Sequence, residues 1–250
     1  VFLLTISFLF GSCIGSFLNV CIYRIPEGIS IVTPASACPN CGTKLAFYCN
    51  IPVFSYLFLT GRCKYCRTPI SIRYPIIECL TGFAAATLIL KFGISLQVIF
   101  WFAFICVLIV ISFIDLDHQI IPDVISLPGI PIFALSYFFV PEMTVKLVLL
   151  GILSGGGSLA MVAVVYYVLR RQEGMGIGDI KLLAMIGAAI GLKGVLFTIF
   201  SGSVAGAVVG FFMILITQKS GLKLKVPFGP FLSMGAVLYI FYGEPIISLY

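Results

Sequence analysis

Charged residues are scarce in this chain, and acidic ones are scarcer still. Of 250 residues only 10% are charged, nine are Asp or Glu, and there is one histidine and one tryptophan. A water-soluble domain of this size has about 25% charged residues, so a soluble fold is excluded. The single histidine, His118, also leaves almost nothing from which to build a Ser-His-Asp triad or a histidine-ligated catalytic zinc.

Apolar residues are abundant instead. They make up 61% of the chain, and the mean hydropathy is +1.19. A membrane-spanning helix needs about 20 mostly apolar residues, and the apolar runs lack the alternation of a transmembrane strand. We therefore expect an all-α polytopic membrane protein with about eight transmembrane helices. The runs lie at residues 1–23, 76–90, 96–114, 124–140, 145–169, 182–192, 194–217 and 227–242, with a tight turn at Gly191, Lys193 and Gly194.

These runs divide the chain into three predicted parts. Residues 1–23 form a first transmembrane helix, 24–75 a polar insert, and 76–250 a membrane core of about seven helices. The small and polar residues of the first run, among them Ser12 and Asn19, and Arg24 at its end favour a retained helix over a cleaved signal peptide.

The distribution of cations predicts the orientation of the chain in the membrane. If the 24–75 insert is cytoplasmic, twelve of the 15 cations face the cytoplasm and only Lys91, Lys146 and Lys193 face the other side. Cytoplasmic loops collect Lys and Arg, so the bias places the insert inside and the amino terminus outside. The twelve are Arg24, Lys44, Arg62, Lys64, Arg67, Arg73, Arg170, Arg171, Lys181, Lys219, Lys223 and Lys225.

Four of the nine cysteines form two Cys-x-x-Cys pairs in the insert, Cys38 with Cys41 and Cys63 with Cys66. Two such pairs provide the four thiolates that a tetrahedral structural zinc prefers, although the 21 residues between the pairs slightly exceed the usual spacing. The alternative is two disulfides, which a reducing cytoplasm disfavours. The sequence therefore predicts a small cytoplasmic zinc-binding insert, with no open position on the metal for a substrate.

The few acidic residues lie where a membrane makes them costly. Asp115, Asp117 and Asp123 fall between two apolar runs, and Asp179 falls between two others. Ionisable residues at such places mark functional sites. Two carboxyl groups held close together share a proton, as in aspartic proteases, where one takes a proton from water and the other polarises the carbonyl. Asp115 and Asp179 are the candidate catalytic pair.

The residues next to the two aspartates suggest either functional or structural roles. Gly176 and Gly178 would let an extended substrate backbone approach Asp179. Asp117, His118 and Asp123 suit either a supporting role or a solvated interfacial turn, in which Asp123 would be a helix N-cap.

Taken in order, several segments resemble the bacterial type IV prepilin peptidases, which are GxGD-type intramembrane aspartic proteases. The segments are residues 10–26, the paired Cys-x-x-Cys insert, 73–78, 115–123 ending in Ile121-Pro122-Asp123, and Gly176-Ile177-Gly178-Asp179. The resemblance implies an inner-membrane endopeptidase that removes the basic leader of prepilins or pseudopilins after a glycine, on the cytoplasmic side, for type IV pili or type II secretion. Its catalytic residues would be Asp115 and Asp179.

The resemblance also implies N-methylation of the newly exposed residue by S-adenosylmethionine, which would be a second cofactor in addition to the structural zinc. The partners of the protein would be prepilin substrates and the lipid bilayer, with no nucleic acid. The sequence does not locate the methyl-donor site, because it has no glycine-rich dinucleotide loop. Asn19, Arg24 and Glu78 are candidates for a cytoplasmic pocket, and they are also explained as polar groups in helix packing or as members of an ion pair.

Two other functions deserve comparison. A proton-coupled transporter also uses intramembrane carboxylates, but the aspartates lie near one membrane face, and two matching halves with discontinuous helices are not evident. A zinc-bearing scaffold that recruits other proteins would require neither Asp115 nor Asp179.

Overall fold

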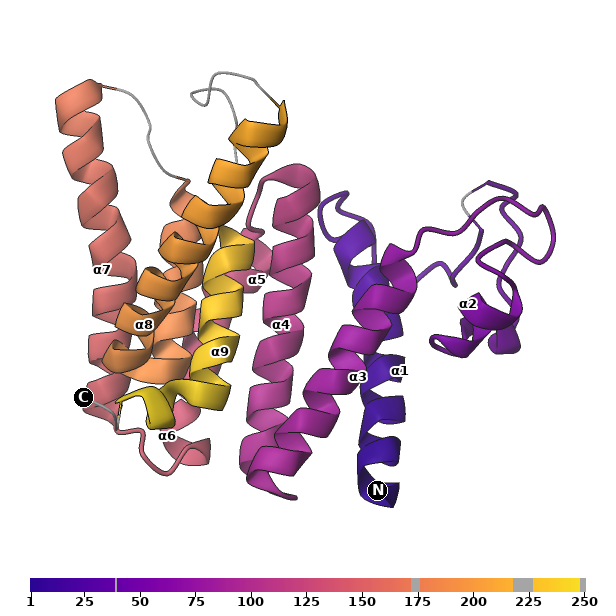
Figure 1. Ribbon diagram of the computed structural model, residues 1–250, viewed down its shortest axis with the longest axis horizontal. Coiled ribbons are helices and arrows are strands. Elements are labelled where there is room, and N and C mark those ends of the chain that lie inside the picture. Colours follow the sequence, from indigo (N-terminus) through magenta and orange to yellow (C-terminus); the bar gives the residue numbers. More distant parts are fainter. Residues whose placement is uncertain (39, 172–175, 218–226, 248–250) are drawn as a thin grey trace. The chain divides into compact units, whose positions relative to one another are not determined.

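The computed structural model describes residues 1–38, 40–171, 176–217 and 227–247, and these fold mainly into helices (Figure 1). The chain divides into two compact units, Val1–Val110 and Ile111–Tyr250. The helices are α1 (Phe2–Arg24), the short 3-10 helix η1 (Phe47–Asn50), α2 (Phe54–Phe58), α3 (Arg73–Phe92), α4 (Leu96–His118), α5 (Asp123–Ala134), α6 (Ser136–Phe139), α7 (Val145–Arg170), α8 (Ile177–Thr217) and α9 (Gly229–Ile247).

Within the described residues, five helices are long and apolar enough to cross a membrane, namely α1, α3, α4, α7 and α8. The predicted membrane character is therefore confirmed, but the number of about eight spans is not. The run at 124–140 forms the 12-residue α5, which contains Pro128 and Pro131, and the short α6. The interruption expected near Gly191 is present, because this residue has φ 69° and ψ −175° inside α8.

In the first unit, α1 packs closely against α3 along small residues. A side chain on Gly15 would place its Cβ 2.7 Å from the Cα of Glu78, so the two backbones approach as small-residue contacts allow. The buried amide of Asn19 donates to the carbonyl oxygens of Gly15 and Tyr74, both at 3.2 Å. Asn19 therefore ties α1 to the first turn of α3.

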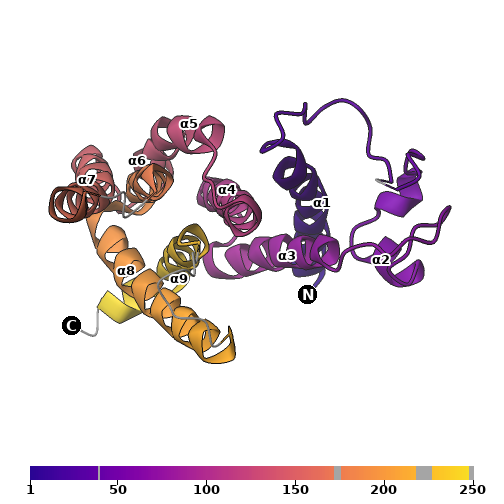
Figure 2. The same ribbon diagram turned by 90° about the horizontal axis from the view of Figure 1, so that it is seen from above.

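In the second unit, the first half of α8 is the central element. Every residue from 182 to 190 is buried, and α8 packs against α5, α7 and α9 (Figure 2). A helix that is apolar all round is typical of a protein core or of a membrane span. Asp179 lies one turn before this buried stretch, so its position is set by the core of the unit.

The contact between α7 and α8 depends on two glycines. A side chain on Gly151 would overlap the carbonyl oxygen of Gly187, whereas nothing lies near the position of a Cβ on Gly157 in the same helix. We expect Gly151→Ala to lower the unfolding free energy by about 1–3 kcal/mol, because backbone atoms cannot move aside as side chains do. Thermal unfolding in detergent would measure the effect. Gly157→Ala is the matched control, and equal melting temperatures for both variants would refute the explanation.

The outer faces of α7 and of the second half of α8 are lined with large apolar side chains. Such continuous apolar surface is not stable in water and is typical of contact with lipid. The exposed residues include Leu153, Met161, Val164, Val168, Phe200, Phe211, Phe212 and Ile216.

Candidate functional site

The four predicted metal ligands come together in the insert. The thiol sulfurs of Cys38, Cys41, Cys63 and Cys66 all lie within 4.8 Å of one another, and Sγ of Cys38 lies 3.7 Å from Sγ of Cys66. Four sulfurs bound to one zinc at about 2.3 Å lie roughly 3.8 Å apart. The cluster therefore has the size of a tetrahedral zinc site. All nine cysteines are free thiols.

The two Cys-x-x-Cys knuckles have the same backbone geometry. In the first, the N–H of Cys38 donates to Thr43 O and the N–H of Gly42 to Cys38 O. In the second, the N–H of Cys63 donates to Thr68 O and the N–H of Arg67 to Cys63 O. Gly42 and Arg67 occupy equivalent positions with φ of 67° and 61°. Two turns thus present their sulfurs to one point.

The surroundings of two of the four cysteines favour thiolates. Hydrogen bonds from the side chain and backbone of Thr68 lower the pKa of the Cys66 thiol to about 5, and Thr43 lowers the pKa of Cys41 in the same way. The amide of Asn40 donates to Oγ1 of Thr68 at 2.8 Å and joins the two knuckles. Thiolates are the form that zinc binds, so the residues present fit a structural zinc.

The two candidate catalytic aspartates lie at helix ends in the second unit. Asp115 is in the last turn of α4, is only 5% exposed and accepts a hydrogen bond from the N–H of Gly229 at 2.9 Å. Asp179 is in the first turn of α8 and is half-buried. The charge of Asp115 acts on the carboxyl group of Asp179. The fold thus allows the two groups to work as a pair.

The short turn between α4 and α5 packs against the start of α8, the helix that carries Asp179. After α4 the backbone reverses at Gln119, where φ is 54°. Ile121 then packs against Gly178, whose added Cβ would lie 2.9 Å from that of Ile121. Gly178 therefore provides close packing for this turn, whereas the space beside Gly176 is bordered by Oδ2 of Asp179.

An ion pair secures the same junction. The Nζ of Lys181 lies 2.7 Å from Oδ1 of Asp123 and joins the start of α8 to the start of α5. The interpretation of Asp123 as a helix N-cap was wrong, because the cap residue is Pro122 and Asp123 is the first residue of the helix. Its carboxylate is held by the lysine instead. Gly174 and Met175 of the glycine-rich segment lie outside the described residues.

One functional group was not predicted, the backbone N–H of Gly229 at the start of α9. The dipeptide Gly229-Pro230 carried a signal for it, since proline favours the first turn of a helix, so a helix start was predictable here. Its contact with Asp115, 114 residues away, was not predictable, because every residue except proline has a backbone N–H and the sequence does not mark the one that donates.

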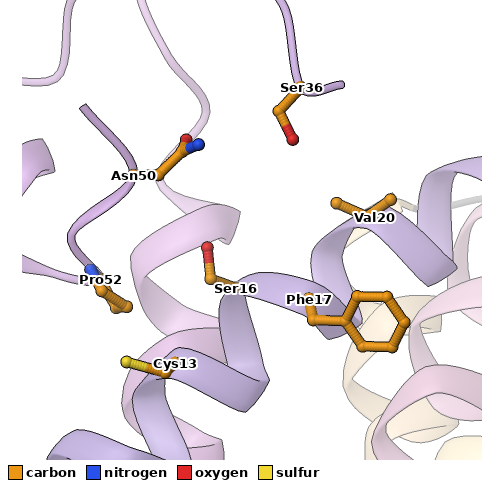
Figure 3. Close-up of a pocket in the computed structure, with 7 residues that line it drawn as sticks. All are labelled: Cys13, Ser16, Phe17, Val20, Ser36, Asn50 and Pro52. Atoms are coloured by element: carbon orange, nitrogen blue, oxygen red, sulfur yellow. The ribbon is translucent and has the colours of Figure 1, made fainter. Parts of the chain in front are cut away.

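A pocket of about 300 Å³ lies between α1 and the insert in the first unit (Figure 3). Both elements contribute polar and apolar side chains to it. The lining residues are Cys13, Ser16, Phe17, Val20, Ser36, Asn50 and Pro52.

Next to this pocket lies the buried carboxylate of Glu78. It accepts hydrogen bonds from the N–H of Val53 at 2.7 Å and from the hydroxyl of Ser16. Val53 has φ 63° and ψ −53°, and the N–H of Phe54 donates to Pro52 O, which is the rare classic γ-turn. Such strained backbone costs about 1–3 kcal/mol and is found at functional sites. Glu78 therefore stabilises a strained turn at the wall of the pocket.

Comparison with known proteins gives matches along most of the chain. Residues 9–92 match the bacterial peptidase A24 N-terminal domain, and residues 102–211 match the type IV leader peptidase family. A protein from Myxococcus xanthus is 39% identical over 218 residues, which is 87% of this chain and 65% of that relative. This chain thus spans about two thirds of the Myxococcus protein. The comparison with solved structures gave no significant match.

Other relatives are close to this chain in length. A protein from Bacillus subtilis is 35% identical over 99% of this chain and 98% of its own length. One from Pseudomonas putida is 31% identical over 99% of this chain and 93% of its own length. All three relatives carry the name prepilin leader peptidase/N-methyltransferase. The resemblance seen in the sequence motifs is confirmed, and the chain belongs to the type IV leader peptidase family.

Proposed function

We propose that this protein is an inner-membrane aspartic endopeptidase that removes the basic leader of type IV prepilins or pseudopilins after a glycine. The observation that carries the proposal is that Asp115 and Asp179 lie at two helix ends of one unit, beside the turn in which Ile121 packs against Gly178. The name of the relatives supports prepilins as the substrate class. It does not favour the proton-coupled transporter.

The reaction follows from two carboxyl groups that share one proton. The unprotonated group takes a proton from a water molecule, which attacks the peptide carbonyl carbon, while the protonated group polarises the carbonyl oxygen. The space beside Gly176 borders the carboxyl group of Asp179 and would admit an extended peptide backbone. The contact of Ile121 with Gly178 and the hydrogen bond from Gly229 to Asp115 hold the two helix ends in place, as such a reaction requires.

We further propose eight membrane crossings, with α5 and α6 counted as one and α8 as two around Gly191. Two contacts support this topology. Gly229 meets Asp115 at the end of α4, and Lys181 meets Asp123 at the start of α5, so four helix ends lie on one side. The cation bias places that side in the cytoplasm, although Lys219, Lys223 and Lys225 lie outside the described residues.

This orientation accounts for how a substrate would be presented. The basic leader of a prepilin stays in the cytoplasm, the apolar pilin helix enters the bilayer, and the scissile bond lies between them at the aspartates. Incubating the purified protein with a prepilin whose leader ends in glycine tests the function. Mass spectrometry should show release of the leader at that glycine. A substrate that stays intact under conditions in which the protein is folded would refute the proposal.

We propose methyl transfer as a second activity of the same chain, located in the first unit. The name of the relatives joins the two activities, and the pocket beside Glu78 has a size at the lower end of small-molecule sites. S-adenosylmethionine would supply a methyl group on a positively charged sulfur. The hydroxyls of Ser16 and Ser36, the amide of Asn50 and the ring of Phe17 suit such a ligand, and the Glu78 carboxylate would attract its charge.

Replacing Glu78 with glutamine should separate the two activities. Glutamine keeps an acceptor for the N–H of Val53 but removes the negative charge, so we expect methylation to fall roughly tenfold or more while leader release stays near the wild-type rate. Mass spectrometry of one processed substrate reports the cut and the methyl group together. The exposed Glu27→Gln is the matched control. A parallel loss of both activities, or of neither, would show that Glu78 has no specific part in methyl transfer.

A further inference from the structure

The two aspartates of the candidate active site have different surroundings. Asp115 is buried, and its Oδ2 accepts the N–H of Gly229, the first residue of α9. Asp179 is more exposed, and its carboxyl group accepts no hydrogen bond from the part of the chain that the structure describes. Neither relationship follows from the sequence motifs that identified the pair.

A backbone N–H can donate a hydrogen bond but cannot accept one. Oδ2 of Asp115 must therefore offer a lone pair toward Gly229, and a hydrogen bond of this kind stabilises the charged carboxylate. The donor also lies at the amino-terminal end of a helix, where the partial positive charge of the peptide dipoles favours an anion. Asp179, in the first turn of α8, also lies at a helix amino terminus, so the hydrogen bond from Gly229 is the effect that acts on Asp115 and not on Asp179.

The position leaves no room for a side chain. A Cβ on residue 229 would lie 2.6 Å from Oδ2 of Asp115 and 3.3 Å from its Cγ. Any residue other than glycine would push the carboxylate away from its place. Glycine is required here for close approach to Asp115.

Building on the proposed peptidase function, we propose that Gly229 is a positioning residue that makes Asp115 the charged base of the pair and leaves the shared proton on Asp179. Asp115 takes a proton from water as the water oxygen bonds to the carbonyl carbon, and Asp179 gives its proton to the carbonyl oxygen. When the C–N bond breaks, the proton on Asp115 passes to the leaving nitrogen. The proton on the former carbonyl oxygen returns to Asp179, so the net reaction consumes one water.

Other charged groups near Asp115 do not account for this asymmetry. Asp179 on α8 carries the same sign of charge, and repulsion between the two carboxylates does not by itself decide which one keeps the proton. Lys181 and Asp123 form an ion pair with each other, and Asp117 at the end of α4 is exposed. Residues 229–243 of α9 include no charged side chain. Within the described residues, burial and the donor on α9 distinguish the two carboxyl groups, and the donor is the feature that favours charge on Asp115.

The pH dependence of leader release by Gly229→Ala tests the proposal. We expect kcat to fall by about 10²-fold and the acidic limb of the rate profile to move up by about one pH unit, with little change in KM. Gly210→Ala is the matched control, because nothing lies within 4 Å of a Cβ there. A wild-type profile for Gly229→Ala would overturn the proposal, and it would leave the peptidase function intact if Asp115→Asn is inactive.

A second comparison does not depend on the folding of the Gly229 variant. An asparagine at 179 can still donate an N–H to the carbonyl oxygen, whereas an asparagine at 115 cannot accept a proton from water. We expect Asp179→Asn to retain at least about tenfold more residual activity than Asp115→Asn. The reverse order would assign the base to Asp179 and overturn the proposal, whereas wild-type activity in both variants would refute the peptidase function itself.

Discussion

Replacing either Asp115 or Asp179 with asparagine should lower the rate of leader release by about 10³-fold or more. Asparagine has nearly the same shape as aspartate, so the packing of Asp115 in α4 and of Asp179 in α8 is preserved. What is lost is the shared proton and the capacity to take one from water. The measurement is single-turnover cleavage of a purified prepilin in detergent or lipid, followed by mass spectrometry.

Two controls make this result specific to catalysis. Glu27→Gln removes an exposed carboxylate from the insert and should cleave at the wild-type rate. Unchanged melting temperatures for the Asp115 and Asp179 variants would show that the fold is intact. Undiminished cleavage by one variant would show that this aspartate has no part in the mechanism. Undiminished cleavage by both variants would refute an aspartic protease mechanism.

The second large effect concerns the metal. The double variant Cys38→Ser/Cys41→Ser should lose its bound zinc, from about one ion per chain to almost none, because two of four thiolates cannot complete a tetrahedral site. Binding of structural zinc contributes about 10–16 kcal/mol in zinc-finger peptides, far more than an insert with few buried residues gains from packing. We therefore expect the 24–75 insert to become sensitive to protease while the membrane helices stay protected.

Metal analysis and limited proteolysis together measure this outcome. Cys49→Ser is the matched control, since Cys49 belongs to the same insert but lies outside the four-sulfur cluster. It should retain both the zinc and the protease resistance of the wild type. Unchanged zinc content in the double variant would mean that the cluster does not hold the ion.

The long helices and the four-cysteine cluster could be predicted from the sequence, because each has a local signal, and the same kind of signal made Asp115 and Asp179 candidates. Apolar runs of sufficient length predicted α1, α3, α4 and α7 to within a few residues. Paired cysteines, and carboxylates beside apolar runs, are unusual enough to predict chemistry on their own. The broken run at 124–140 was predicted as one span, although Pro128 and Pro131 lie in the middle of it.

What the sequence did not reveal depends on the backbone. The N–H of Gly229 reaches Asp115 only after α9 packs into the second unit, and the N–H of Val53 in the γ-turn donates to Glu78, 25 residues away. A valine favours extended backbone, so its local preference points away from the observed conformation. Such contacts join residues that are distant in the chain, so local sequence patterns do not predict them.

The hydrogen bond from Gly229 to Asp115 also has a consequence for biosynthesis. Both aspartates leave the ribosome long before residue 229, so a nascent chain carries the pair but not the donor that holds one member in place. On the proposed mechanism, full proteolytic activity appears only when α9 joins the bundle. A truncated or unfinished enzyme would then do little harm to neighbouring proteins in the membrane.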